Sequence, residues 1–294
     1  MKHQALRRLA AALLPFSILS CSKDILRVPI VNTVWEYSAS ETQTARFCFT
    51  DDEHVSLLQH ILSDGRIQVS NGVYIADGHN VECHGANGTG STVKLIRTLS
   101  HLKTGTKNLT PMGPKAHDSL CGSIWSTIAE DKLQFCFFLA DGQCYSGTFT
   151  NMTSPLAGNA KWSGSEGTYT LNGNQLGITV GFSTRNATLY RDVMVVDSLG
   201  VLNVSPAVTP EGRSDYSGTV WAHDGDVPAV IVFTAPGHFT RISRSSGTIF
   251  IVREGSYTED EDLLTLKQEG LEAESVSVSG STLTYLKDSY RRLR

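Results

Sequence analysis

The chain has 294 residues, of which 40% are hydrophobic, and its 25 Lys and Arg against 29 Asp and Glu give a net charge of −4. This length predicts about two domains, and the hydrophobic content is high enough to bury real cores, which argues against a disordered chain. The slightly acidic balance argues against nucleic acid as a partner, because phosphate binding needs a basic stripe.

The first twenty residues have the features of a secretion signal. Lys2, Arg7 and Arg8 give a positively charged start, and residues 9–19 form an apolar core of eleven residues. That core is too short for a membrane-spanning helix, which needs roughly 20 apolar residues. We therefore expect residues 1–20 to be a signal peptide that is absent from the mature protein.

The end of this leader, Ile18-Leu19-Ser20-Cys21, resembles the lipobox of bacterial lipoproteins. The resemblance implies transfer of diacylglycerol to the Cys21 thiol, cleavage after Ser20 and acylation of the new amino terminus. Several acyl chains hold a protein firmly on a bilayer, whereas one binds only marginally. The next residues, Ser22-Lys23-Asp24, resemble the short charged export tag of Bacteroidota surface lipoproteins. We expect a protein anchored to the outer membrane, exposed at the cell surface, with residues 21–31 as a tether.

Three copies of one module follow the tether. Trp35, Trp125 and Trp221 share a frame, at spacings of 90 and 96 residues. After each Trp come a strand-like aromatic or β-branched segment, a Gly-x-Tyr-x-x-Asp/Asn element and a further strand. These segments are 47–49, 72–77 and 93–97, then 135–137, 167–172 and 188–192, then 231–233, 255–260 and 284–288.

The repeat and the prolines predict the domain boundaries. The modules are expected at residues 32–102, 121–198 and 217–290. Linkers at 103–120 and 199–216 separate them, and these linkers hold four of the nine prolines.

The modules are predicted to be all-β. Leu133, Phe135 and Phe137 alternate with other side chains, the period-two pattern of a strand with one buried face. Asp-Gly at 77–78 and Asn-Gly at 172–173 occupy the same repeat position and favour a tight hairpin turn. We expect three tandem antiparallel β-meanders, each closing toward a small barrel, because closure removes exposed strand edges.

The order Gly-x-x-Trp, aromatic strand, Gly-x-Tyr-x-x-Asp/Asn-Gly and closing Tyr-Arg/Lys strand resembles the lipocalin-like domains of Bacteroidota lipoproteins. The resemblance covers most of the mature chain, three times over. It implies a lipocalin-like fold more strongly than an activity. The third copy departs from the pattern with Glu261, where the other two copies have Gly.

The four Trp residues are candidate ligand contacts. Trp35, Trp125 and Trp221 fit the aromatic wall of a ligand cavity or a core plug at one end of each barrel, and their threefold repetition favours the plug. Trp162 lies outside the repeat frame, near glycines in a predicted loop, and is expected to be an exposed contact.

Two kinds of covalent modification are also predicted. Five cysteines follow Cys21, so at least one thiol stays unpaired. The within-module disulfide candidates are Cys48 with Cys83 and Cys136 with Cys144, and the alternative is that all four are small buried hydrophobes. Two Asp-Ser-Leu triplets, at Ser119 and Ser198, resemble Bacteroidota O-glycosylation sites, although so short a motif also arises by chance.

No local motif predicts a cofactor, a metal ion or a catalytic centre. His79 and His84 flank a predicted hairpin strand near Cys83, but without Cys-x-x-Cys or His-x-x-x-His spacing a solvated hairpin is favoured. The acidic run 259–262 lacks the spacing of a calcium loop. The serine-hydrolase, zinc-protease and phosphate-loop motifs are missing.

These observations predict a non-catalytic lipoprotein of the cell envelope. Its partner, besides the membrane, is expected to be a glycan, an apolar small molecule or another envelope protein. The alternative is a structural or accessory subunit of an outer-membrane complex. A carbohydrate-active hydrolase is the third possibility, because paired carboxylates converge from distant strands and leave no local motif.

Overall fold

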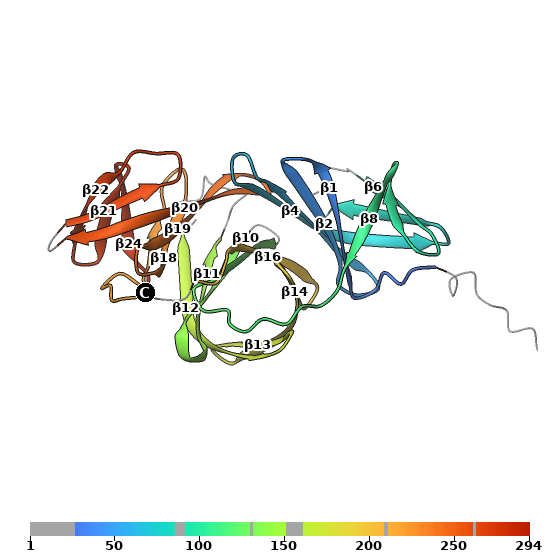
Figure 1. The fold of residues 1–294 in the computed structure, drawn as a ribbon, viewed down its shortest axis with the longest axis horizontal. Coiled ribbons are helices and arrows are strands. Elements are labelled where there is room, and N and C mark those ends of the chain that lie inside the picture. The colour runs from blue at the N-terminus through green and yellow to red at the C-terminus, as the bar shows by residue number, and fades with distance from the viewer. Residues whose placement is uncertain (1–26, 86–91, 130–131, 151–160, 209–210, 261–262) are drawn as a thin grey trace, which may run out of the picture.

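A computed structural model describes residues 27–85, 92–129, 132–150, 161–208, 211–260 and 263–294 (Figure 1). It is all-β, as predicted, with one short 3₁₀ turn, η1 (Ala140–Gly142), among the described residues. No helix in these ranges is long and apolar enough to cross a bilayer. The predicted signal peptide and Cys21 lie outside the described residues.

The strands in the described ranges fall into three consecutive sets of eight. Barrel 1 comprises β1 (Thr33–Ser40), β2 (Gln43–Phe49), β3 (His54–Ile61), β4 (Arg66–Asp77), β5 (Asn80–Gly85), β6 (Thr92–Arg97), β7 (Leu102–Thr104) and β8 (Lys107–Met112). Barrel 2 comprises β9 (Ile124–Ala129), β10 (Lys132–Phe138), β11 (Gln143–Phe149), β12 (Trp162–Asn172), β13 (Gln175–Val180), β14 (Ser183–Tyr190), β15 (Val193–Val196) and β16 (Leu199–Ser205). Barrel 3 comprises β17 (Val220–His223), β18 (Ala229–Ala235), β19 (His238–Ser246), β20 (Ile249–Asp260), β21 (Leu263–Gln268), β22 (Glu274–Ser279), β23 (Thr282–Tyr285) and β24 (Asp288–Arg292).

Each set is an antiparallel meander whose last strand returns to its first. β8 pairs with β1, β16 with β9 and β24 with β17. Barrels 1 and 3 are also joined to each other, because Ile249–Ile251 of β20 pair with residues 66–68 of β4 to make one 16-stranded sheet. In Figure 1 β4 and β20 run between the two outer barrels, and barrel 2 lies beneath them.

The predicted boundaries between the modules are wrong in two places. β7 and β8 lie in the predicted linker 103–120 or at its edge, and β16 lies in the predicted linker 199–216. The prolines predict linkers, but Pro111 lies inside β8, and Pro206 comes directly after β16. The connections between barrels are therefore shorter than predicted, at residues 113–123 and 206–219, and the last strands belong to the barrels that they close.

The Trp repeat marks the same structural position in each barrel. The Trp indole Nε1 donates a hydrogen bond to the hydroxyl two residues earlier, from Trp35 to Thr33 (2.8 Å), Trp125 to Ser123 (3.0 Å) and Trp221 to Thr219 (2.9 Å). Each hydroxyl donates in turn to the carbonyl oxygen three residues before it. The Trp element of the predicted repeat is thus a repeat in space, whereas the closing segments are not equivalent, because 93–97 and 188–192 lie at the sixth strands and 284–288 at β23 and β24.

The strand alternation produces two kinds of core. One face of each barrel wall lines that barrel's own interior, and three separate clusters of buried residues fill these interiors. The opposite faces meet in a fourth cluster that draws residues from all three barrels, including Leu58, Phe137 and Val232. The three barrels therefore share one central core that none of them encloses.

Close backbone approach and a buried charge network fix the contact between barrels 1 and 2. A Cβ at Gly200 would lie 2.9 Å from Ser56 Cβ and 3.1 Å from Cys48 Sγ, so a side chain there would push the barrels apart. Nearby, the buried Arg46 guanidinium pairs with Glu36 (3.0 Å) from its own barrel and with Asp192 (2.7 Å) from barrel 2.

Candidate functional site

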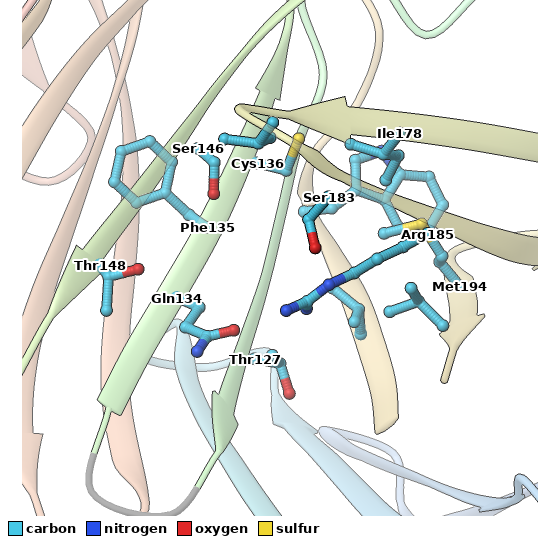
Figure 2. A pocket seen from close by; sticks show the side chains of 14 residues that line it. Thr127, Gln134, Phe135, Cys136, Ser146, Thr148, Ile178, Ser183, Arg185 and Met194 are labelled. Carbon is cyan, nitrogen blue, oxygen red and sulfur yellow. The ribbon is translucent and has the colours of Figure 1, made fainter. Parts of the chain in front are cut away.

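The interior of barrel 2 contains a cavity of about 280 Å³. This volume lies just below the roughly 300–1,000 Å³ that is typical of small-molecule sites. The lining comes from strands all around the barrel, and Figure 2 shows these side chains converging on the cavity. The cavity is therefore the lumen of the barrel, and the closed strand ring holds its walls in place.

The lining is apolar at the deep end of the barrel and mixed at the other end, where Ile178 and Val180 lie beside polar residues. At the deep end Trp125, Met194, Val196 and Val201 are buried. Thr127, Gln134, Ser146 and Thr148 follow on β9–β11, and the exposed Ser183 and Arg185 lie at the rim on β14. A cavity with this gradient offers an apolar floor and hydrogen-bonding groups at its mouth.

The segment that precedes β9 covers the deep end of the barrel. Lys115 N donates to Leu189 O (2.8 Å) and His117 N to Gly173 O (3.1 Å), so the chain from barrel 1 runs across this end. The His117 ring meets the Trp125 ring edge-on at 6.2 Å. Trp125 thus plugs this end of barrel 2, and it also forms part of the cavity floor.

Barrel 3 fills the equivalent positions with large side chains. The register places Tyr290, opposite Leu283, where barrel 2 has Val201 opposite Met194. Tyr285 in barrel 3 is likewise equivalent to Val196 in barrel 2, because each lies two residues after the equivalent pair Leu283 and Met194. Both tyrosines are fully buried in barrel 3, where Arg241 Nε donates to Tyr290 Oη at 3.1 Å.

The interior of barrel 1 is filled less completely than that of barrel 3 and more completely than that of barrel 2. It encloses a smaller cavity of about 220 Å³, lined by apolar residues such as Phe47 and Leu57 and by Gln59, Gln68 and His84. None of its lining residues is an arginine or a lysine. The cavity of barrel 2 is therefore the larger of the two and the one with a cation at its mouth.

Arg185 gives the mouth of the barrel 2 cavity a positive charge. Its side chain reaches into the cavity in Figure 2, and its Nε lies 3.6 Å from Asp197 Oδ2 in a half-exposed ion pair. Exposed pairs of this kind are weak, at about 0–1 kcal/mol. The recorded contact with Asp197 is made through Nε, and the terminal NH₂ groups of a guanidinium are further donors of the kind that bind planar anions.

Two thiols lie at the wall of the same cavity. Cys136 is in the lining, and it shares a hydrogen bond with Cys144 on the neighbouring strand β11. This hydrogen bond and burial together raise the pKa of Cys136 well above its usual value. The predicted Cys136–Cys144 disulfide is not formed in this structure, where the two sulfurs are in contact as thiols.

The other predicted disulfide is contradicted by the geometry. Cys48 faces the central core shared by the three barrels, whereas Cys83 faces the interior of barrel 1. The two thiols therefore lie on opposite sides of the barrel wall and are free. Burial raises the pKa of each to about 12, so both behave as small buried hydrophobes.

The repeated Trp residues lie apart from one another, one in each barrel. Trp35 and Trp221 are buried plugs of barrels 1 and 3. Of the three, Trp125 lines the barrel 2 cavity. The sequence could not distinguish Trp125 from the others, because the difference arises from what lies opposite it across the barrel.

The prediction that Trp162 is an exposed contact is wrong. It begins strand β12, is 1% exposed, and packs its ring against Phe135 (5.8 Å) and Phe149 (5.3 Å) in the shared core. Its backbone is also tied to barrel 3, since its N–H donates to Asp224 (2.7 Å) and its carbonyl accepts from Arg291. Trp162 therefore stabilises the contact between barrels 2 and 3.

The remaining predicted residues are dispersed. Ser119 is exposed in the connection between barrels 1 and 2, and Ser198 is half-buried in the turn between β15 and β16. His84 contacts Thr92 and Glu82 at the surface of barrel 1. In the described ranges no group of three or more His, Cys, Asp or Glu residues is arranged to hold a metal ion.

A second concavity, of about 670 Å³, lies where the β3–β4 turn meets β20 and β21. Its lining includes Asp64, Arg253, Glu254 and Glu269. Burial, and then the negative charge of Glu269, raise the pKa of Glu254. These two are the carboxyl groups to replace first in a test for hydrolase activity.

Comparisons with known proteins do not identify a family. No family model matches the chain, and no curated protein matches it. Among solved structures, a DNA polymerase sliding clamp from Pseudomonas aeruginosa is 9% identical, with a TM-score of 0.15, over 91% of this chain and 93% of that one. The LG1-3 region of the laminin α2 chain is 8% identical, with a TM-score of 0.14, over 90% of this chain and 88% of that one. Scores this low are no basis for assigning a fold family or a function.

Proposed function

We propose that this protein is a non-catalytic lipoprotein of the bacterial cell envelope that binds a small molecule inside its middle barrel. The observation that supports binding is the barrel 2 cavity, with its apolar floor and polar mouth. The lipobox-like sequence at Cys21 supports the location. In this proposal barrels 1 and 3 brace barrel 2 from both sides and hold it away from the anchor.

The contrast with barrel 3 supports a functional rather than an accidental cavity. Interiors of proteins are normally packed to the density of organic crystals, and an unfilled space costs stability. Barrel 3 shows that the same strand plan can be filled, with Tyr285 and Tyr290 at the positions of Val196 and Val201. The cavity in barrel 2 is explained if a small molecule binds there.

The binding proposal is tested by native mass spectrometry of the unlipidated mature chain that begins at Ser22. The protein is exposed to a glycan and lipid extract and then transferred to buffer. We expect a retained small-molecule mass, and we expect its loss in the variant V196Y/V201Y, which fills the lumen as barrel 3 does. Retention of the same mass by this variant would place the ligand elsewhere. Recovery of a protein partner with no small molecule would favour an accessory subunit instead.

The anchor has a separate test. Replacing Cys21 with Ala removes the thiol that would carry diacylglycerol, so we expect the C21A variant to leave the membrane fraction. An S22A variant should remain with the membrane. Membrane retention of the C21A variant would contradict the lipoprotein assignment and leave the binding proposal unaffected.

A further inference from the structure

We infer that the ligand of barrel 2 is an anionic amphiphile, with an apolar chain on the Trp125 floor and a carboxylate or similar planar anion at Arg185. This inference rests on the proposed function and names the chemical class that the cavity would accept. Three observations carry it: the order of the lining residues, the size of the cavity and an exposed aromatic side chain at its lip.

The order of the lining residues sets the direction of the ligand. An apolar group gains about 25 cal/mol for each Å² that it removes from water, and the buried floor of Trp125, Met194 and Val201 provides such a surface. A charged head cannot lie there without a large desolvation cost. Arg185 is the charged residue among those that line the cavity, and it lies at the exposed end.

The chemistry of Arg185 selects the sign and shape of the head. A guanidinium presents parallel N–H donors that match the two oxygens of a carboxylate. Its partner in the described part of the chain, Asp197, is 3.6 Å away through Nε and is itself half-exposed. A ligand carboxylate can therefore join Arg185 without breaking a buried ion pair. Gln134, Thr148 and Ser183 add hydrogen-bonding groups around the same mouth.

The cavity volume limits the length of the chain. Dividing about 280 Å³ by the roughly 30 Å³ that one water molecule occupies in the liquid gives space for about nine non-hydrogen atoms. A medium-length acyl or aryl chain fits this space. A two-chain lipid does not, so the lumen would take a single apolar chain.

Phe182 provides an independent sign that the mouth meets apolar material. It is fully exposed at the tip of the β13–β14 turn, between Val180 and Ser183, which both line the cavity. A large aromatic side chain in this position loses solvent contact only when something apolar approaches the mouth. An amphiphile that enters head-last would pass beside it.

The test compares three probes of one chain length on the unlipidated mature chain. Binding of decanoate, decanol and decyltrimethylammonium is measured by isothermal titration calorimetry, with decanol below its solubility limit and the two ionic probes below their micelle-forming concentrations. We expect decanoate to bind about tenfold more tightly than decanol, and the cationic probe most weakly. The R185Q variant should lose about tenfold in decanoate affinity while its decanol affinity stays the same. The R213Q variant, which changes an exposed arginine outside the lining, should bind all three probes like the parent protein.

The outcomes separate this inference from the proposed function. Equal affinities for decanoate and decanol, both lost in V196Y/V201Y, would keep the cavity as a binding site and overturn the anionic head group. Failure of all three probes, beside a retained mass in the extract experiment, would overturn the amphiphile inference alone. Failure of the probes and no retained mass would overturn both.

Discussion

Barrels 2 and 3 share strand order, hairpin register and the Trp–hydroxyl contact, but they differ in what occupies the lumen. Barrel 2 has Val196, Val201 and Ser146 where barrel 3 has Tyr285, Tyr290 and Arg241. In barrel 3 these larger side chains pack together, and in barrel 2 their absence leaves the cavity. The same strand order and register therefore form whether small or large side chains point into the lumen.

In the proposed function this difference lets one fold serve as a brace in barrel 3 and as a binding site in barrel 2. The outward faces of both barrels contribute to the same central core, so their attachment to each other does not depend on the lumen. Substitutions that empty one lumen therefore need not separate the barrels. Stability and binding are then properties of different faces of the same strands.

The largest expected effect comes from truncating the filler of barrel 3. Replacing the fully buried Tyr290 with Ala should lower the free energy of unfolding by about 3–5 kcal/mol, as for other buried aromatics. The matched V201A variant removes two methyl groups that already face the barrel 2 cavity, and we expect a loss of about 1 kcal/mol. Urea denaturation of both variants measures the difference. Equal losses would mean that barrel 2 is as tightly filled as barrel 3.

The strands and the modules could be predicted because their signals are local. A period of two in residues 133–137 and the recurrence of Ser/Thr-x-Trp are visible in the sequence, and both are found in the structure. The direction of the alternation was not predictable. Leu133 and Phe137 face the central core between barrels, Phe135 packs in that core and also borders the cavity, and Gln134 and Cys136 face the lumen.

The cavity and the interface residues depend on contacts between distant segments. The equivalence of Val201 and Tyr290 requires the register of β15–β16 and β23–β24, which the sequence repeat misaligned when it matched 188–192 with 284–288. The glycines near Trp162 predict an exposed loop, and its backbone partners Asp224 and Arg291 could not be foreseen because they belong to another barrel. The sequence did contain one sign of the cavity. Gln134 and Cys136, which are polar or small, alternate along the strand with the large apolar residues at 133, 135 and 137.

Removing the Trp–hydroxyl hydrogen bond should lower the free energy of unfolding by a smaller amount, and by the same amount in barrels 2 and 3. Replacing Ser123 with Ala or Thr219 with Val leaves the buried indole N–H of Trp125 or Trp221 without its acceptor. Each change should cost about 1–3 kcal/mol, the penalty for an unsatisfied buried donor. The same denaturation experiment measures both. A markedly smaller loss for S123A would indicate that water in the cavity reaches the Trp125 indole N–H. The cavity floor at Trp125 would then be less dry than we propose.

The smallest effect concerns thiol reactivity at one matched position. Cys136 and Ile231 occupy equivalent sites opposite Trp125 and Trp221. A small neutral thiol reagent should reach Cys136 through the cavity, whereas the thiol of an I231C variant should react several-fold more slowly inside the filled barrel.

Because a thiolate is the reactive form and the pKa of Cys136 is raised, labelling should accelerate as the pH rises and continue to do so above pH 9. Peptide mass spectrometry resolves Cys136 from the other cysteines, with Cys48, whose pKa is raised to about 12 in the shared core, as the unreactive internal control. A decanoate-saturated sample should protect Cys136 alone. Equal labelling with and without decanoate would show that the amphiphile does not pass this part of the wall.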